Sequence, residues 1–272
     1  METGDNLLDF FIVGAQKAGT TALHTFLSQH PGIDLPAVKE IHHFDDEVGV
    51  NWDNPDHSRL HSYFDWSQPA IRGDSTPIYS YWPNSIERIH RYNPEAKLIL
   101  ALRHPLFRAM SHWRMEIERK AETLSFAAAV SSFGRRRVSE SLNGVHRIYS
   151  YIERGYYSSH LTRIYRLFPR DSVHVYRADQ LWDRPGVTLA SIESFLGVEP
   201  NLARTLKPRY VAPVVSPAFT LDPSLARDLK DHFEADIWKT AELARLDLSD
   251  WVEDYSEPMC QPECTIEAEI PA

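Results

Sequence analysis

The feature that most constrains the fold of this chain is a repeated order of short apolar runs, each followed by a turn and a helix-like stretch. The runs span 7–13, 97–102 and 173–176, and the first ends at Gly14. After the first two runs, apolar residues return every three or four positions, which is the period of a helix packed on one side. Apolar strands that alternate with helices are typical of a parallel sheet. We therefore expect a single α/β domain with a parallel central sheet flanked by helices on both faces.

Length and charge agree with one domain that has a local anion site. The chain has 272 residues, of which 43% are hydrophobic and 25% are charged, which suits one core. The chain becomes acidic and proline-punctuated after Trp251, so we expect the domain to span 1–255 and a flexible tail to span 256–272. The formal net charge of -9 argues against a nucleic-acid partner or an anionic membrane surface.

The cysteines and the chain start bear on the compartment. Cys260 and Cys264 both lie in the predicted tail, so we expect neither a disulfide-built core nor a four-ligand zinc site. The first residues lack the basic, apolar and small-residue pattern of a signal peptide. No apolar run approaches the roughly 18 residues that span a bilayer. These features favour a cytoplasmic protein without a membrane span, and they leave the role of the two cysteines and the oligomeric state open.

The segment after the first predicted strand has the features of a phosphate-binding loop. Residues 13–21 read Val-Gly-Ala-Gln-Lys-Ala-Gly-Thr-Thr and lie where open α/β sheets bind phosphate, between a strand and the start of a helix. Small residues let backbone amides approach an anion, and the lysine and threonines add a charge and hydroxyl donors. An ordinary glycine turn capped by Thr20 is the alternative. The predicted contacts to the anion come from Gln16, Lys17, Ala18, Gly19, Thr20 and Thr21.

The spacing within this loop differs from that of loops that bind nucleoside triphosphates. In those loops lysine directly follows the second glycine, whereas here Lys17 precedes Gly19 by two positions. The predicted strand 97–102 also ends without an acidic residue that could hold magnesium. A kinase would therefore lack its metal. Sulfuryl transfer does not need one, because its terminal oxygens carry less charge than those of a phosphoryl group.

A second candidate phosphate site follows the strand 97–102. Arg103 can present paired donors to a phosphate, and Ser111 can add a hydroxyl from the next helix. Taken alone, these could be a surface ion-pair residue and a neutral helix residue. Together with the first loop, at the end of a separate strand, they predict a ligand with two separated phosphate groups.

These two elements resemble those of sulfotransferases that use 3′-phosphoadenosine-5′-phosphosulfate (PAPS), in the branch of the heparan sulfate sulfotransferases and their bacterial relatives. Residues 17–23 read Lys-Ala-Gly-Thr-Thr-Ala-Leu and are similar to the family's 5′-phosphosulfate-binding loop. Residues 102–113 resemble its 3′-phosphate-binding element. The resemblance runs from about residue 10 to residue 251. It implies a P-loop-like fold, PAPS as the donor, adenosine 3′,5′-bisphosphate (PAP) as the product and no required metal.

Two further donor contacts follow from the resemblance. Tyr157, in the stretch Arg-Gly-Tyr-Tyr over 154–157, is implied to bind the donor. Arg209 is implied to contact the 3′-phosphate. It lies in Lys-Pro-Arg over 207–209, where relatives often have Lys-Gly-Arg.

The resemblance also implies where proton transfer takes place. Residues 39–45 read Lys-Glu-Ile-His-His-Phe-Asp and are similar to a run of the family's carbohydrate enzymes whose glutamate is the catalytic base. This implies that Glu40 is the base and that His42 and Asp45 arrange or bind the acceptor. Lys17 would stabilise the charge that grows on the leaving oxygen.

The stretch 73–79 resembles a family segment near the acceptor, which implies that Ser75 and Tyr79 lie at the acceptor site. Ser75 stands where the relatives usually have lysine. The missing cation favours a neutral or less charged acceptor over a strongly anionic polysaccharide.

The sequence thus predicts direct in-line transfer of a sulfuryl group to a hydroxyl, or less readily an amine, of a sugar-containing or other small-molecule natural product. A P-loop-type small-molecule kinase and an inactive nucleotide-binding scaffold protein are the alternatives. The identity of the acceptor is not readable from the residues.

Overall fold

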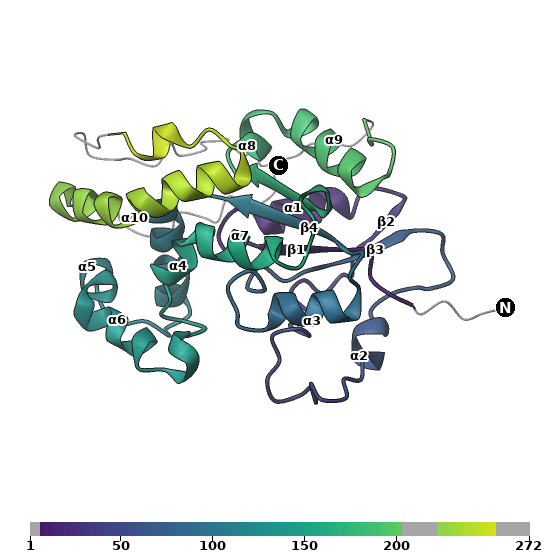
Figure 1. Ribbon diagram of the computed structural model, residues 1–272, viewed down its shortest axis with the longest axis horizontal. Helices are drawn as coiled ribbons and strands as arrows, with labels where there is room; N and C mark the ends of the chain where they lie inside the picture. Colours follow the sequence, from purple (N-terminus) through teal and green to yellow (C-terminus); the bar gives the residue numbers. More distant parts are fainter. Residues whose placement is uncertain (1–5, 203–221, 254–272) are drawn as a thin grey trace, which may run out of the picture.

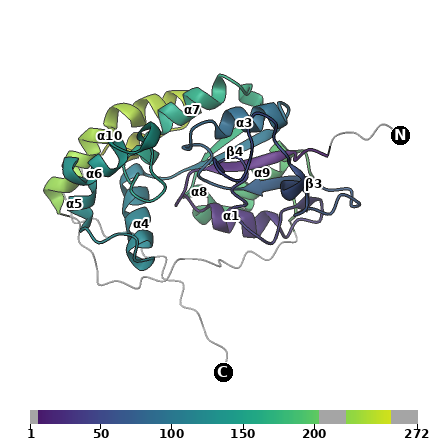
Figure 2. The same ribbon diagram turned by 90° about the horizontal axis from the view of Figure 1, so that it is seen from below.

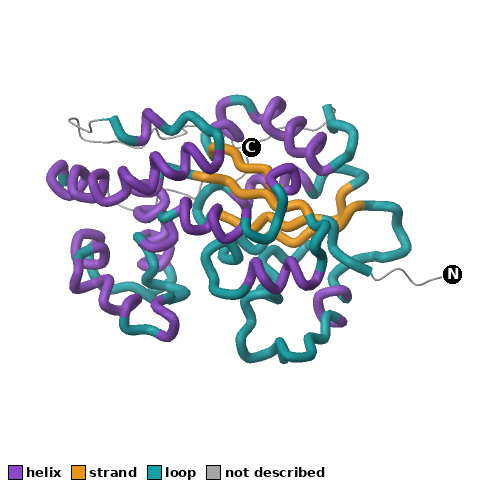
Figure 3. The backbone as a smooth tube through the Cα atoms, viewed as in Figure 1, coloured by secondary structure: helices purple, strands orange, loops and turns teal. Residues whose placement is uncertain are grey.

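The computed structural model describes residues 6–202 and 222–253, and these contain one sheet of five parallel strands. The strand order is β2-β3-β1-β4-β5. The strands lie together among the helices (Figures 1 and 3). The strands are β1 Phe10–Gly14, β2 Ile33–Asp34, β3 Ile71–Ser75, β4 Lys97–Leu102 and β5 Val173–Arg177. The expected parallel α/β sheet is confirmed. The apolar runs predicted β1, β4 and β5, but not β2 or β3.

The helices cover both faces of this sheet, as expected. Figure 2 shows α3 and α7 on one side of the strands and α1 on the other. The segment after α9 contacts the segment after α1, because His30 Nε2 lies 2.7 Å from the backbone oxygen of Glu199. The longest helix, α10, packs on α7 and α4. The helices are α1 Thr20–Leu27, α2 Ser58–His61, α3 Ser85–Tyr92, α4 Pro105–Glu118, α5 Phe126–Val130, α6 Ser132–Ser139, α7 Tyr157–Tyr165, α8 Gln180–Asp183, α9 Pro185–Leu196 and α10 Pro223–Ala244.

The central strand β1 sets the position of the loop that follows it. All five of its residues are buried, and it lies between β3 and β4, with Phe10 paired to Gly73 and Lys97. A Cβ added at Gly14 would lie 2.3 Å from Ser80 Oγ, closer than real contacts allow. It would also lie 2.9 Å from Leu100 on β4, so glycine at this position lets β1 end without displacing β4 or the turn that carries Ser80.

Within residues 6–202 and 222–253, no helix is long and apolar enough to cross a membrane. The predicted tail 256–272, with Cys260 and Cys264, lies outside the described residues, so the division at 255 stays a prediction.

Buried histidines make a prediction about acid stability. Burial lowers the pKa of His43 and His104 to about 4 and that of His160 to about 3. Each ring stays neutral in the folded chain while the unfolded chain takes up a proton below about pH 6.5. The contribution of each neutral ring to the stability of the fold is therefore full above pH 6.5 and is lost as the pH falls toward 4. Between pH 7 and 5 we expect the free energy of unfolding to fall by roughly 1–2 kcal/mol for each buried histidine.

Urea denaturation of the full chain at pH 7 and pH 5 measures this loss. His160→Asn, if it folds, should narrow the difference between the two pH values. The same difference between pH 7 and pH 5 in His160→Asn as in the native chain would show that this ring does not titrate as expected.

Candidate active site

The loop after β1 is shaped to present backbone amides. Ala15 N–H donates to the backbone oxygen of Ala101 on β4, at 2.8 Å, which ties the loop to the neighbouring strand. Lys17 and Gly19 have φ angles of 72° and 78°, in the left-handed region. Glycine adopts this region freely, whereas lysine is strained there, as residues at binding sites often are. Gly19 precedes α1, and no described side chain caps that helix end. The first amides of α1 are therefore available to an anion.

The two predicted phosphate elements meet. Arg103 Nη1 donates to the backbone oxygen of Lys17 at 3.0 Å, and the Tyr157 hydroxyl donates to the backbone oxygen of Arg103 at 2.7 Å. Lys17 Nζ lies 3.6 Å from Met115 Sδ on α4, one helical turn after Ser111. The structure thus brings Lys17, Arg103 and Tyr157 together and places Ser111 on the helix beside them. Arg209 lies outside the described residues.

Buried positive charge surrounds this junction. Burial, followed by the charge of Arg103, lowers the pKa of Lys17, and burial lowers the pKa of Arg103 to about 10. Among the described residues, neither Lys17 nor Arg103 forms a salt bridge with a carboxylate. A polyanionic ligand would supply the missing counter-charge. The residues therefore fit the two phosphate-bearing ends of PAPS.

Two further buried arginines were not predicted as site residues. Arg154 Nη1 donates to Gln16 Oε1 in the loop, and Arg108 Nη2 donates to the backbone oxygen of Tyr151. The Nε atoms of both arginines have no partner in the described part of the chain. Burial, followed by the charge of Arg108, lowers the pKa of Arg154 to about 10. Arg108 lies at helical spacing between His104, which caps α4, and His112, and all three side chains are buried.

The candidate base lies on the chain between β2 and α2. Lys39 Nζ lies 2.5 Å from Glu40 Oε1, and His42 Nε2 lies 3.6 Å from Glu40 Oε2. The backbone N–H of Glu40 donates to the backbone oxygen of Ser75 at the end of β3, at 3.2 Å. Glu40 and His42 both have positive φ angles, 64° and 57°. Two strained residues at one candidate site point to a functional constraint on this loop.

The pKa values of Glu40 and His42 are shifted in opposite directions. Burial opposes ionisation of Glu40, but the hydrogen bond to His42 and the charge of Lys39 outweigh it and lower the pKa of Glu40 to about 2. The hydrogen bond to Asp45, and then that to Glu40, raise the pKa of His42 to about 9. At neutral pH Glu40 is ionised and His42 carries a proton. Of the two, only Glu40 can accept one.

The remaining predicted acceptor residues are Asp45, in this loop, Ser75, at the end of β3, and Tyr79, after it. Asp45 is fully buried and accepts from His42 Nδ1 at 2.9 Å. Tyr79 is fully buried and donates to Asp74 Oδ2 at 2.7 Å. Ser75 is buried, and its hydroxyl has no partner among the described residues. Asp45 and Tyr79 make hydrogen bonds to residues of the loop, at His42 and His43. The contact of Asp45, Ser75 and Tyr79 with an acceptor stays a prediction.

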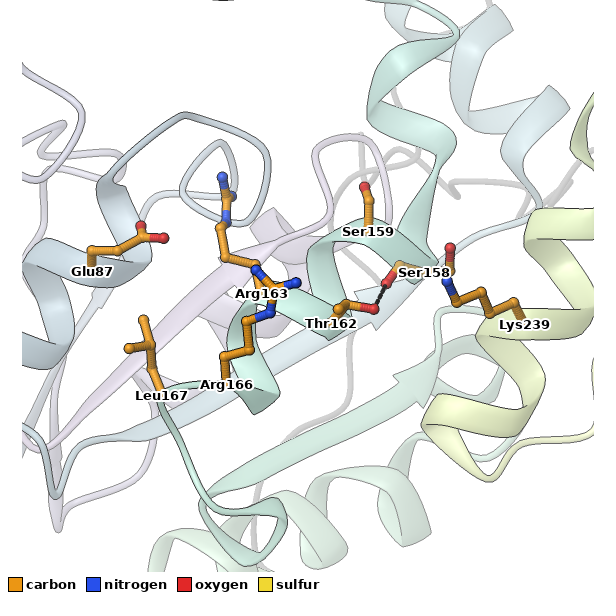
Figure 4. A pocket seen from close by; sticks show the side chains of 8 residues that line it. All are labelled: Glu87, Ser158, Ser159, Thr162, Arg163, Arg166, Leu167 and Lys239. Carbon is orange, nitrogen blue, oxygen red and sulfur yellow. Dashed lines mark hydrogen bonds between the residues drawn. The ribbon is translucent and has the colours of Figure 1, made fainter.

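A cavity of about 430 Å³ lies elsewhere, between α3, α7 and α10 (Figure 4). None of the predicted site residues lines it. Its lining consists of Glu87, Ser158, Ser159, Thr162, Arg163, Arg166, Leu167 and Lys239. The converging loops, rather than this cavity, therefore define the candidate site. In the described part of the chain, no three His, Cys, Asp or Glu side chains are placed to hold a metal ion.

Comparisons with known proteins agree with this geometry. Residues 7–210 match the family model described as the sulfotransferase domain. Human heparan sulfate glucosamine 3-O-sulfotransferase 5 is 28% identical over 197 residues, covering 71% of this chain and 54% of the relative. Human heparan sulfate glucosamine 3-O-sulfotransferase 6 is 31% identical over 191 residues, covering 69% of this chain and 52% of the relative. The chain thus spans about half the length of these curated relatives.

Solved structures show the same fold. A sulfotransferase from Alicyclobacillus acidocaldarius superposes with a TM-score of 0.74 at 26% identity, covering 90% of this chain and 99% of that chain. A mouse sulfotransferase in complex with PAP superposes with a TM-score of 0.54 at 17% identity, covering 88% and 86%, which supports the fold alone. With a domain match over most of its length, the chain belongs to the sulfotransferase family, whose members are PAPS-dependent enzymes.

Proposed function

We propose that this protein transfers the sulfuryl group of PAPS to a hydroxyl of a sugar-containing or other small-molecule natural product. The observation that carries the proposal is the 3.0 Å contact between Arg103 and the backbone of Lys17, which joins two cationic elements that lack carboxylate partners in the described chain. The donor has an anionic group at each end of its nucleoside, so one ligand can satisfy both elements. The curated relatives act on heparan sulfate glucosamine, which supports a sugar acceptor.

On the donor side, the residues of this chain bind and orient PAPS. The amides and hydroxyls of 16–21 would hold the phosphosulfate end, and Arg103 and Ser111 would hold the 3′-phosphate. Tyr157 fixes the backbone of Arg103 rather than reaching outward. Lys17, whose pKa is lowered by burial, is a cation with few competing partners. When bound, the donor supplies the sulfuryl group, and Lys17 would stabilise the negative charge left on its 5′-phosphate.

On the acceptor side, Glu40 removes the proton. Its low pKa makes it a weak base for a resting alcohol, but the hydroxyl becomes acidic as it attacks, and an ionised carboxylate is then a sufficient acceptor. His42 cannot take this role at neutral pH, because it already carries a proton. It orients Glu40 instead. Ser75, buried and uncharged, adds no cation for an anionic acceptor, so a neutral or less charged acceptor fits better.

Calorimetry separates donor binding from the kinase alternative. We expect PAP to bind the full chain with equal affinity with and without magnesium, because cationic side chains hold both phosphates. ATP should bind more weakly, since it lacks the 3′-phosphate. Tighter ATP binding that requires magnesium would favour the kinase, and no binding of PAP would exclude the proposed donor.

Replacing the loop lysine tests catalysis. Lys17→Ala should lower turnover by about 100-fold or more, the scale seen when a preorganised transition-state donor is removed. Lys239→Ala, an exposed cation away from the loop, is the matched control and should keep full turnover. The assay follows PAP release and an 80-dalton-class mass gain on candidate acceptors. Near-normal turnover by Lys17→Ala would remove this residue from the mechanism.

Replacing the candidate base separates binding from chemistry. Glu40→Gln should keep PAP affinity and lose most turnover toward an alcohol. In the native chain, turnover should be level from pH 6 to 8, because Glu40 is ionised and His42 is protonated there. It should fall as the pH rises through about 9, where His42 loses its proton. A rate that rises steadily from pH 6 to 8 would indicate that another group is the base.

A further inference from the structure

Arg147 lies in the segment between α6 and α7, far in sequence from residues 39–45, which we call the acceptor loop, yet it binds that loop directly. Its Nη1 donates to Asp45 Oδ2 at 2.5 Å, and its Nη2 donates to the backbone oxygen of Asp45 at 2.5 Å. The guanidinium also stacks over the ring of Trp82, 4.2 Å from the centroid. One side chain thus fixes both the backbone and the carboxylate of Asp45.

Asp45 in turn fixes the ring of His42. It is fully buried, and its Oδ2 accepts from both Arg147 and His42 Nδ1. A buried carboxylate is stable only when its charge is matched, so Asp45 depends on both cations. The other nitrogen of His42 faces Glu40 at 3.6 Å. The orientation of His42 toward Glu40 is therefore set by a carboxylate that Arg147 holds in place.

The same segment is attached to the phosphate loop. Arg154 Nη2 donates to the backbone oxygen of Arg147 at 2.6 Å, and Arg154 Nη1 donates to Gln16 Oε1. Arg154 is itself buried, so this link is shielded from solvent. Direct hydrogen bonds therefore run from the phosphate loop through this segment to the acceptor loop.

We infer that Arg147 is a positioning residue that fixes Asp45, and through it His42 and Glu40, on a segment anchored to the phosphate loop. The catalytic part of this inference rests on the proposed function, since Glu40 and His42 act there on the acceptor. Arg147 acts through Asp45 and needs no contact with the reacting atoms. Its side chain is 43% exposed, but its guanidinium is occupied by Asp45 and Trp82.

Nuclear magnetic resonance titration of the His42 ring tests the inference without an acceptor. The charged groups that act on His42 are Glu40 and Asp45, with Asp74 beneath the loop and Lys39 on the far oxygen of Glu40. Removing the cation at Arg147 leaves the Asp45 charge to His42 alone. The midpoint of the His42 titration should therefore rise by about one pH unit in Arg147→Met.

The variants are made in the full chain, and His42→Asn identifies the signal. Arg136→Met is the matched control, because Arg136 pairs with Glu140 on the exposed surface of α6. It should leave the midpoint unchanged. Arg147→Lys keeps the charge but cannot donate to both Asp45 oxygens with one planar group, so it should shift the midpoint less. If Arg147→Met does not fold, the test uses Arg147→Lys, in which the midpoint of the His42 titration should also rise.

Turnover gives the second readout, with PAPS and octyl β-glucoside as a neutral glycoside of the proposed acceptor class. Arg147→Met should lower turnover by about 10- to 100-fold, the scale of a misplaced catalytic group, while PAP affinity stays within about twofold. Arg147→Lys should recover part of the rate. A His42 midpoint that does not move, or native turnover in Arg147→Met, would overturn the positioning role. Failure of the native chain to bind PAP would overturn the proposed function instead and leave the titration to decide the role of Arg147.

Discussion

The candidate site depends on one contact, the hydrogen bond from Arg103 to the backbone of Lys17. It forms because β1 and β4 are adjacent and parallel, so the loops at their carboxyl ends start side by side. The chain moves from β1 toward β2 on one side of the sheet and from β4 to β5 on the other. Open α/β sheets bind ligands in the crevice that this reversal creates. Two loops that each carry a cation thus meet at the one place where the topology leaves room between them.

The same contact explains why the junction is positively charged without obvious compensation. Arg103, Arg108 and Arg154 are all removed from water to a large extent, and none of them pairs with a carboxylate in the described residues. Buried cations reduce stability unless backbone oxygens or counter-ions satisfy them. Backbone carbonyls of Lys17, Tyr151 and their neighbours supply part of this compensation. A bound anionic donor would supply the remainder, and donor binding would then stabilise the loops.

The sequence predicted elements well where local pattern and burial agree. The predicted runs 97–102 and 173–176 correspond to β4 Lys97–Leu102 and β5 Val173–Arg177. Strand β3 was not predicted, because its letters Ile-Arg-Gly-Asp-Ser do not read as apolar. Two of its polar side chains, Arg72 and Asp74, are nevertheless hydrogen-bonded inside the protein. Arg72 donates to three backbone oxygens, and Asp74 accepts from Thr76 and Tyr79.

In the site, too, features encoded by local sequence could be predicted, whereas contacts between residues far apart in sequence could not. Lys17 and Arg103 follow predicted strands, so their convergence could be inferred from the chain alone. Arg147 stands in no recognisable pattern, Arg154 was recognised only as part of the stretch that implied Tyr157, and their partners are 102 and 138 positions away. No local propensity encodes such contacts, because they exist only once α4 to α7 have folded against the sheet. Sequence could thus predict that the two cationic loops meet, but not what holds the acceptor loop in place.

That loop requires support because its backbone is strained. Glu40 and His42 hold positive φ angles, a conformation that persists only when surrounding contacts determine it. One support is the end of β3, which carries polar groups. There, burial raises the pKa of Asp74 to about 6, although the hydrogen bonds from Tyr79 and Thr76 lower it. The other support is Arg147, which forms a salt bridge with Asp45. The result is a carboxylate with a lowered pKa beside an imidazole with a raised one, and such separation of two pKa values is how a protein assigns different proton roles to neighbouring groups.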